Sequence, residues 1–374
     1  MYQSRGPALP GSETDRLILG LIQSGQATTQ TELVQASGLK QQAISRAVGH
    51  LVDLGLLRTG PRLTSGRRGQ PSIVLELNPD HLFTLGVSIM ADAVSLMIMD
   101  LSSTARGYLT LTPPDMSRTS VLEATSAALD QLCQDTKIHR DKLVGIGVGI
   151  TGFALEGGRR FNPPASLEDW AQCDVAALFE AFFHVPVWAD NDGNVAAAGE
   201  SLVGVGLWAR TFAYFYIATG FGGGLVLDGR LVRGVHGNAG EFAAAVPQSL
   251  YVPPTLDLLR HCYAQRGQGF DTIGALLAEL DVTAPAVDDW LNRISDSLSL
   301  ACSASWAILD PDAIVLGGRL PRALAERMIQ RIELRNAPVR GLDRPRPRIV
   351  PSEVTGDATA LGAAALPLKH LVFA

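Results

Sequence analysis

The chain has 374 residues, of which 47% are hydrophobic and 18% are charged, and its formal net charge at pH 7 is −6. This length accommodates two or three domains with full hydrophobic cores, and the composition excludes an intrinsically disordered chain. No apolar run reaches the roughly 18 residues that a membrane-spanning helix needs, because Asp92 and Asp100 interrupt the most apolar stretch. The first fifteen residues lack the apolar core of a secretory signal, and the four cysteines include no C-x-x-C pair. We therefore expect a cytoplasmic protein without membrane association, disulfide framework or thiolate zinc site.

Basic residues are concentrated near the N-terminus. Residues 1–80 carry eight Lys or Arg and six Asp or Glu, whereas the remainder carries 23 basic and 31 acidic residues, a net charge of −8. Between residues 40 and 70, six basic residues stand against one acid, Asp53. An acidic body with a basic head is typical of a protein in which only the head binds a polyanion, although a solvated basic surface would give the same count.

The first predicted helix is marked by the apolar residues of LILGLI, residues 17–22. Ser12 or Thr14 can cap its N-terminus, and Gly25 ends it. The segment that precedes residue 30 is therefore expected to hold one amphipathic helix.

A helix-turn-helix pattern follows. Thr29 and Glu32 have the spacing of a capping box, which begins a short helix, and Ser37-Gly38-Leu39 forms the turn. The next helix is predicted over residues 40–54. Its apolar stripe is expected to bury Ala43, Ile44, Ala47, Val48 and Leu51.

The residues outside that stripe have the chemistry needed to read bases. Gln can make paired hydrogen bonds to adenine and Arg to guanine, from a helix whose N-terminal end enters the major groove. A three-helix module that binds another protein would share the helical pattern, but it would not require these polar residues on this face. We therefore expect contacts to double-stranded operator DNA from Gln41, Gln42, Ser45 and Arg46.

Two strands are predicted after this helix, near residues 56–58 and over SIVLEL, residues 72–77. The loop between them is rich in Gly and Arg, which suits close approach to phosphate or to a minor groove. Arg67 and Arg68 lie in this loop and are expected to contact DNA. The helices and strands together predict a winged helix-turn-helix domain over residues 1–80.

The rest of the chain alternates strand patterns with helix patterns. Strands are predicted as a meander over 82–111 and at 144–150, 185–189, 213–218, 225–227 and 313–318. Helices are predicted at 120–136, 174–183, 195–203, 256–266, 273–280 and 290–308. This alternation predicts an α/β body with doubly wound sheets, whose ligands bind at the carboxyl ends of the strands.

Three segments carry a more specific signal. They are PVWADNDGNVAAAGE (186–200), YIATGFGGGLVLDGRLVRGVHGNAGE (216–241) and the pair LDPDAIVLGGRL (309–320) with TGDATALGAAA (355–365). Together with the N-terminal head, these motifs resemble the ROK family of sugar kinases and sugar-responsive repressors, in its regulator branch with repressors of the xylose and N-acetylglucosamine type. The resemblance covers nearly the whole chain. It implies that the winged helix-turn-helix is followed by a two-lobed sugar-kinase/actin-like ATPase fold.

The resemblance also implies a sugar site. Asn191 and Asp192 match the family's Asn-Asp pair that holds sugar hydroxyls, and Asp192 also matches the catalytic base of the kinases. Glu241 matches an acidic sugar ligand, and Asn162 matches the Asn of a loop on the sugar side. An Asp-Asn-Asp-Gly sequence would equally suit a turn at the end of a strand that binds no ligand.

This chain departs from the kinases at the loop that approaches the ATP phosphates. The kinases have Asp-x-Gly-Gly-Thr there, whereas this chain has SIMAD, residues 88–92. Ser88 replaces an acid that helps to hold magnesium, Met90 and Ala91 replace glycines, and Asp92 adds a negative charge toward the phosphates. We therefore expect no catalytic activity and no cofactor.

The zinc loop of the family has no counterpart in this sequence. After Glu241 the chain continues FAAAVPQSLYVPP without His or Cys, so the four N or S ligands of a zinc ion are not available locally. His261 and Cys262 fit helix packing, and His236 fits a surface turn. We expect no bound metal.

These observations predict a sugar-responsive transcriptional regulator, a repressor, that is a homodimer or homotetramer on two-fold DNA sites. Its expected units are the head over 1–80, a first lobe over 81–190 with a C-terminal return over 355–374, and a second lobe over 191–354 with ligand-site and dimerisation elements. Two alternatives remain open. One is a ROK sugar kinase with an appended DNA-binding domain, and the other is a regulator that responds to a protein partner or a non-sugar ligand.

Overall fold

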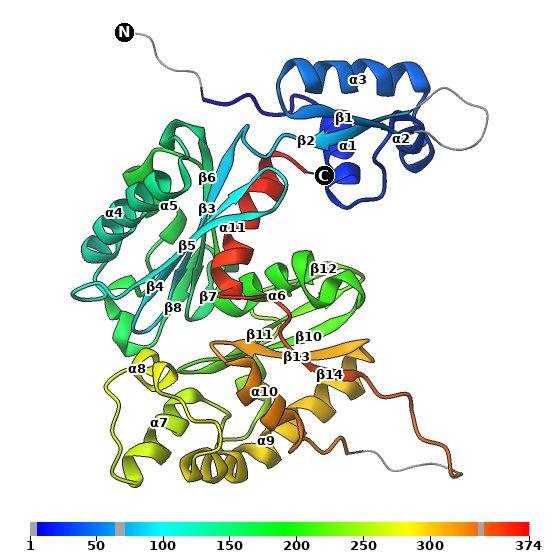
Figure 1. Ribbon diagram of the computed structural model, residues 1–374. Coiled ribbons are helices and arrows are strands. Elements are labelled where there is room, and N and C mark those ends of the chain that lie inside the picture. The colour runs from blue at the N-terminus through cyan, green and yellow to red at the C-terminus, as the bar shows by residue number, and fades with distance from the viewer. Residues whose placement is uncertain (1–5, 64–71, 336–339, 374) are drawn as a thin grey trace.

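The computed structural model describes residues 6–63, 72–335 and 340–373. The chain forms a small N-terminal domain, blue in Figure 1, and two larger α/β lobes. Within the described ranges, no helix combines the length and the apolar character needed to cross a bilayer.

The N-terminal domain contains three helices and a two-stranded antiparallel sheet. These elements are α1 (Glu13–Gln23), α2 (Gln30–Ser37), α3 (Gln41–Asp53), β1 (Leu57–Leu63) and β2 (Ser72–Leu77). Capping boxes at Ser12 and Thr29 begin α1 and α2, and Gly38 ends α2 with a φ of 69°, which glycine adopts without strain. The predicted winged helix-turn-helix is confirmed.

Two details of this domain differ from the expectation. Ala43 is exposed rather than buried and Ala47 is only half-buried, because the fully buried stripe of α3 consists of Ile44, Val48 and Leu51. β1 continues to Leu63, well beyond the predicted strand, because β2 supplies a pairing partner as far as Ser72.

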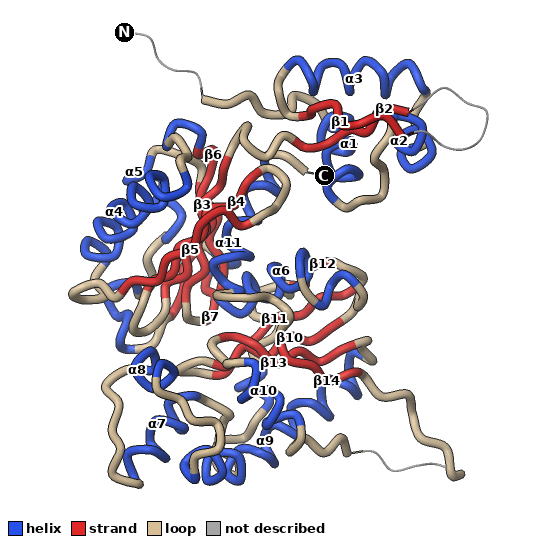
Figure 2. Tube along the Cα trace, viewed as in Figure 1, coloured by secondary structure: helices blue, strands red, loops and turns tan. Residues whose placement is uncertain are grey.

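The first lobe is built on a five-stranded sheet in the order β5-β4-β3-β6-β9. Side chains alternate along its strands, so that Leu96 and Ile98 pack under α4 and α5 whereas Met97 and Met99 pack toward α11. Figure 2 shows the resulting helices on both faces of the sheet. The antiparallel strands are β3 (Phe83–Ile89), β4 (Val94–Asp100) and β5 (Ala105–Leu111), the strands parallel to β3 are β6 (Leu143–Ile150) and β9 (Val187–Asn191), and the helices are α4 (Arg118–Thr136), α5 (Val175–Phe183) and α11 (Ala358–Leu371).

The second lobe repeats this strand arrangement in the order β12-β11-β10-β13-β14. Its antiparallel strands are β10 (Phe212–Ile217), β11 (Phe221–Leu227) and β12 (Arg230–Val232), and β13 (Ala313–Gly318) and β14 (Arg348–Pro351) run parallel to β10. One face packs against α6 (Asp192–Val203), and the other against α7 (Leu256–Gln265), α8 (Ile273–Ala278), α9 (Pro285–Leu309) and α10 (Arg322–Ile329). The predicted two-lobed α/β body is therefore confirmed. A separate hairpin of β7 (Phe153–Leu155) and β8 (Arg160–Asn162) follows β6.

The Gly-rich stretch 222–224 lies inside a strand, although the sequence predicts the strand only from residue 225. β11 begins at Phe221, and residues 218–220 form the turn from β10. A Cβ on Gly223 would lie 2.0 Å from the carbonyl oxygen of Tyr214, and one on Gly224 would lie 2.7 Å from the Cβ of Ala197 in α6. Glycine is therefore required at positions 223 and 224 by close packing against β10 and α6, whereas a Cβ on Gly222 would meet no atom within 4 Å.

The C-terminal helix α11 packs on the first lobe, although the residues before it belong to the second. A Cβ on Gly86 in β3 would lie 1.9 Å from the carbonyl oxygen of Ala360, and a Cβ on Gly147 in β6 would lie 1.9 Å from that of Ala363. The helix can lie this close to the sheet only because both strands have glycine at the contact.

The N-terminal domain shares a hydrophobic core with the first lobe. Ile18 and Leu51 of the domain belong to the same buried cluster as Met99 of β4, and Leu368 and Val372 at the end of the chain. Figure 1 shows the C-terminus beside α1. The two units are therefore packed together rather than only tethered.

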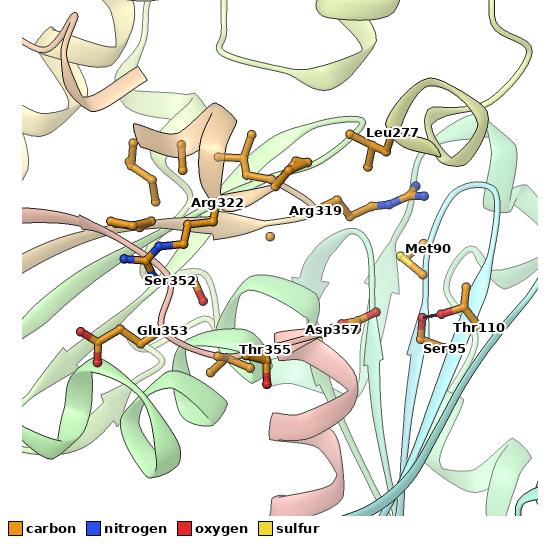
Figure 3. A pocket seen from close by; sticks show the side chains of 18 of the residues that line it. Met90, Ser95, Thr110, Leu277, Arg319, Arg322, Ser352, Glu353, Thr355 and Asp357 are labelled. Atoms are coloured by element: carbon orange, nitrogen blue, oxygen red, sulfur yellow. Dashed lines mark hydrogen bonds between the residues drawn. The ribbon is translucent and has the colours of Figure 1, made fainter. Parts of the chain in front are cut away.

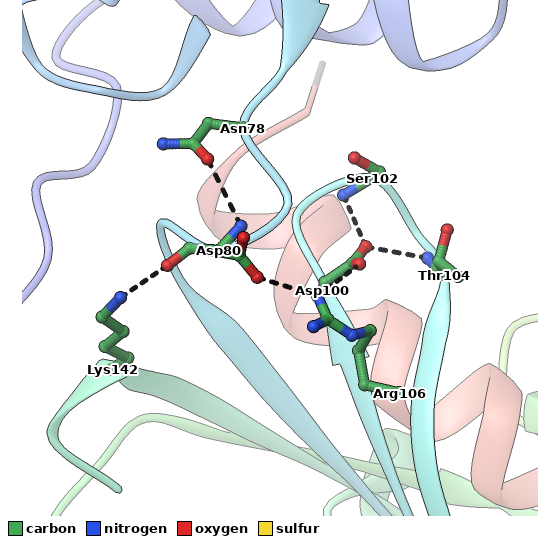
Figure 4. A network of polar contacts seen from close by, with 7 residues as sticks. All are labelled: Asn78, Asp80, Asp100, Ser102, Thr104, Arg106 and Lys142. Carbon is green, nitrogen blue, oxygen red and sulfur yellow. Dashed lines mark hydrogen bonds and ion pairs between the residues drawn. The ribbon is translucent and has the colours of Figure 1, made fainter. Parts of the chain in front are cut away.

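A polar network anchors the segment that joins them (Figure 4). The guanidinium of Arg106 donates to Asp80 at 3.0 Å and to the buried Asp100 at 3.3 Å. Lys142 donates to the main-chain oxygen of Asp80 at 2.7 Å. These contacts hold the junction against the ends of β4, β5 and β6.

Candidate functional site

A cavity of about 150 Å³ lies between the lobes, where the carboxyl ends of β6 and β9 meet the β10–β11 turn. Its lining includes three of the residues predicted from the sequence, namely Asn191, Asp192 and Glu241. This position agrees with the general rule that ligands of α/β sheets bind at the carboxyl ends of strands.

Asn191 caps helix α6. Its Oδ1 accepts hydrogen bonds from the backbone of Gly193 at 2.8 Å and of Asn194 at 3.3 Å, and its Nδ2 donates to the carbonyl oxygen of Gly152 at 2.8 Å. The amide is therefore already committed to fixing the β9–α6 turn. Asn191 lines the cavity and also stabilises the turn at the end of β9, which the sequence allowed as the alternative to ligand binding.

Asp192 is the first residue of α6 and is 5% exposed. Its Oδ2 accepts a hydrogen bond from the hydroxyl of Thr151 at 2.7 Å, and its Oδ1 accepts one from the backbone of Gly193 at 2.9 Å. Burial, together with the nearby charges of Glu241 and Asp357, raises its pKa to about 7, although the two hydrogen bonds oppose this rise. The carboxyl can therefore accept or release a proton near neutral pH.

Glu241 lines the same cavity and lies at the end of the predicted segment 216–241. Burial raises the pKa of its carboxyl above the ordinary value. Among the described residues the carboxyl group of Glu241 has no hydrogen-bond or ion-pair partner, so its oxygens are available to a ligand.

Asn162 lies outside the lining of this cavity. It is exposed in β8, where it pairs across the hairpin with Phe153, and Phe153 does line the cavity. The structure thus brings Asn191, Asp192 and Glu241 together and leaves Asn162 one strand away from them.

The sequence did not single out Thr151 or Arg319, and both line the cavity. Each immediately follows a strand that runs parallel to β3 or β10, Thr151 after β6 and Arg319 after β13. Their positions at strand ends were the available signal, because parallel strands collect functional side chains there.

A larger cavity of about 500 Å³ adjoins the first, and Met90 and Arg319 line both (Figure 3). In the larger cavity, Met90, Ser95 and Thr110 come from the first lobe, whereas Arg322 comes from the second. Asp357, the N-cap of α11, lies at the floor of this cleft in Figure 3. The cleft between the lobes is therefore open beyond the small cavity.

The structure adds a partner for Asp92, the residue expected to place a negative charge toward the phosphates. Its carboxylate forms an ion pair with Arg319 at 2.5 Å and accepts a hydrogen bond from the backbone of Gly274 at 3.3 Å. Ser88 is fully buried, and its hydroxyl has no hydrogen-bond partner. The end of β3 therefore offers a buried hydroxyl at Ser88, where the kinases of the family have an acid that helps to hold magnesium.

The candidate DNA-binding face lies on α3, on the side of the N-terminal domain away from the lobes (Figure 1). Gln41, Gln42, Ser45 and Arg46 are all exposed there. Arg67 and Arg68 of the wing lie outside the described residues.

Within the part of the chain that the structure describes, no three His, Cys, Asp or Glu side chains are grouped so that they could hold a metal ion. His236 and His261 are exposed, and Cys262 is buried in α7.

Comparisons with known sequences identify two family matches. The ROK family model matches residues 84–248, and the MarR family model matches residues 12–68. An uncharacterized protein of Sinorhizobium fredii, y4fQ, is 31% identical over 98% of this chain and 94% of its own length. The xylose repressor of Bacillus spizizenii is 25% identical over 60% of this chain and 58% of its own length.

Comparisons with solved structures agree on the fold. A ROK family transcriptional regulator, homologous to the E. coli MLC protein, matches 94% of each chain with 19% identity and a TM-score of 0.65. A ROK family glucokinase from Streptomyces griseus, in complex with glucose and AMPPNP, matches 76% of this chain and 98% of its own with 18% identity and a TM-score of 0.60. The longer match includes the N-terminal domain as well as both lobes.

Proposed function

The chain belongs to the ROK family and carries a winged helix-turn-helix, and on that premise we propose that it is a transcriptional regulator, a repressor, that senses a sugar or sugar derivative. Operator DNA binds α3 and the wing, and the ligand binds the cavity of Asn191, Asp192 and Glu241. The observation that carries this proposal is the hydrophobic core shared by the DNA-binding domain and the first lobe, because it allows a change at the cleft to reach α3.

The cavity has the chemistry for a polyhydroxylated ligand. Carboxylates accept hydrogen bonds from hydroxyl groups, and Asp192 and Glu241 both supply a carboxyl to the lining of the same small cavity. A sugar seated there would contact residues of both lobes, so its binding would favour one angle between them.

The DNA-binding step needs two copies of the head. Two-fold DNA sites have half-sites about 34 Å apart, or a multiple of that distance, so a homodimer or homotetramer places two α3 helices in successive major grooves. A change in lobe angle alters the separation of the two helices. Loss of two good base contacts, each worth about 1–3 kcal/mol, lowers DNA affinity by orders of magnitude.

One observation favours a second candidate, a sugar kinase with an appended DNA-binding domain. A carboxyl with a pKa of about 7 in a cleft suits a general base. Ser88 and the ion pair of Asp92 with Arg319 oppose it, because they replace groups that would hold magnesium and phosphate. Turnover of ATP with a panel of hexoses, abolished in Asp192→Asn, would establish the kinase.

The test of the proposed function combines a mobility shift with a ligand screen. We expect binding to the DNA upstream of the gene at low salt, and no binding to any fragment at low salt would refute the proposal. In thermal-shift screens of sugars, amino sugars and sugar derivatives, a ligand at about 100 times its Kd adds about 2.7 kcal/mol to the stability of the fold. A protein that binds DNA but no sugar would instead be a regulator that responds to a protein partner or a non-sugar ligand.

A further inference from the structure

Two loops that face each other across the cleft are joined by one ion pair. Asp92 lies in the β3–β4 turn of the first lobe, and Arg319 follows β13 in the second. Nη1 of Arg319 lies 2.5 Å from Oδ1 of Asp92. The side chain of Asp92 is 16% exposed and that of Arg319 is 14% exposed. It is therefore a partly buried ionic contact between the lobes.

This contact lies at the boundary between the two cavities. Arg319 lines both of them, as does Met90, which is two residues before Asp92. The β3–β4 turn is the segment in which the kinases of the family have the glycines that approach ATP phosphates. A phosphate that entered between the loops would need the positive charge of Arg319. The carboxylate of Asp92 already forms an ion pair with that guanidinium.

An ion pair of this kind contributes little to the stability of the fold. Removing two charges from water costs about as much as their attraction returns, so a buried pair is often no more stabilising than two apolar side chains. Its effect on charged ligands is much larger. A phosphate beside this pair would meet a carboxylate at short range in a cleft that is partly shielded from water, where repulsion between like charges is stronger than in bulk water.

The other ionic groups of the cleft do not replace the positive charge of Arg319 that Asp92 neutralises. Glu353 and Asp357 line the larger cavity and Asp192 and Glu241 the smaller one, against Arg322 and the neutralised Arg319. The cleft that surrounds the ligand is therefore acidic as long as Asp92 holds Arg319.

We propose that Asp92 and Arg319 are the specificity-determining residues of the ligand cleft, because their ion pair bridges the lobes and restricts the ligand to an uncharged sugar or sugar derivative, excluding sugar phosphates and nucleotides. This inference rests on the proposed ligand cleft and names the class of its ligand. Nε and Nη2 of the Arg319 guanidinium have no hydrogen-bond partner among the described residues, so removal of the Asp92 charge leaves an anion-binding guanidinium at the wall of both cavities.

The decisive probe is inorganic phosphate, titrated calorimetrically into the full chain at pH 7.5 and constant ionic strength. Asp92→Asn should bind phosphate at least roughly tenfold more tightly than the wild type, the gain expected from one charge-assisted hydrogen bond. Glu353→Gln is the matched control, because it removes a carboxylate from the same cavity wall without touching Arg319. The double variant Asp92→Asn/Arg319→Met should lose this increase in phosphate affinity.

Equal phosphate affinity in the wild type and Asp92→Asn, an equal gain in Glu353→Gln, or a gain that survives in the double variant would each overturn the inference. If Asp92→Asn folds poorly, Asp92→Ser is titrated in its place. The serine keeps an oxygen as a hydrogen-bond acceptor for the backbone of Gly274. Thermal melts give an independent check, since the two single variants should lower Tm by more in sum than the double variant does, whereas additive losses would contradict the bridge. The titration needs neither the effector nor the operator, so its failure is distinct from failure of the proposed function.

Discussion

Asp192 lines the candidate ligand cavity, and the burial of its carboxyl lowers the stability of the fold at neutral pH. In an unfolded chain an Asp carboxyl titrates near pH 4, whereas burial raises the pKa of Asp192 to about 7. Between these values the folded protein holds a proton that the unfolded chain has released. The free energy of unfolding therefore falls as the pH rises from about 4 to about 7, and the loss is complete above that range.

Replacing Asp192 by Asn removes this titration. The stability of Asp192→Asn relative to the wild type should be greater at pH 8 than at pH 5 by ~3 kcal/mol, since about two pH units separate pH 5 from the folded pKa and each contributes about 1.4 kcal/mol. Urea unfolding at the two pH values measures the difference. The same relative stability at both would show that this carboxyl titrates normally.

Arg46 is the exposed cation of α3 beside Gln42 and Ser45. Arg46→Ala should weaken binding to the operator by about 1–3 kcal/mol and relax the preference at one base pair, if its guanidinium contacts a guanine. Arg118→Ala, an exposed arginine of α4 in the first lobe, is the control and should leave the affinity unchanged. Mobility shifts with single-base operator variants distinguish lost base reading from a lost phosphate contact, which would weaken all sequences equally.

At the scale of an element, α11 depends on glycines in the strands beneath it. Gly147→Ala places a methyl group 1.9 Å from the carbonyl oxygen of Ala363, and overpacking of this kind costs about 1–3 kcal/mol or more. Gly49 in α3 provides the contrast, because a Cβ there meets no atom within 4 Å. Gly49→Ala should stabilise the fold by up to about 1 kcal/mol, since alanine has the higher helix propensity.

Chemical denaturation of both glycine variants tests this difference. We expect shifts of opposite sign in the midpoint. Gly147→Ala with wild-type stability would mean that α11 does not pack on β6 as closely as the structure places it.

At the scale of the whole molecule, the shared core predicts that the DNA-binding domain and the first lobe unfold together. Val372, at the end of the chain, is fully buried in that core. Val372→Asp would place an unpaired charge there, which is strongly unfavourable. The variant should show a separate, lower-temperature transition for the DNA-binding domain in calorimetry, and DNA binding that no longer responds to ligand.

Val235→Asp is the matched control, because this valine is 92% exposed. It should retain the wild-type unfolding profile. A single unchanged transition in Val372→Asp would contradict the mechanical connection between the C-terminal helix and the head.

Local sequence patterns accounted for much of this architecture. Helix caps at Ser12 and Thr29 and the turn at Gly38 identified the head, because capping depends on residues three or four positions apart. The alternation of strand and helix patterns identified the body, and motif resemblance identified Asn191, Asp192 and Glu241. These features are readable because their physical cause lies within a few residues or within a recognisable motif.

The remaining features depend on residues that are distant in sequence and adjacent in space. Asp92 and Arg319 are 227 positions apart, so the sequence alone indicated no partner for the negative charge of Asp92 and did not single out Arg319. Gly223 and Gly224 of β11 are explained by Tyr214 and Ala197, and the head shares its core with residues near the end of the chain. The sequence thus established the two kinds of domain and most of the candidate site, whereas the ionic state of the cleft and its connection to the head follow from long-range packing, which no local pattern encodes.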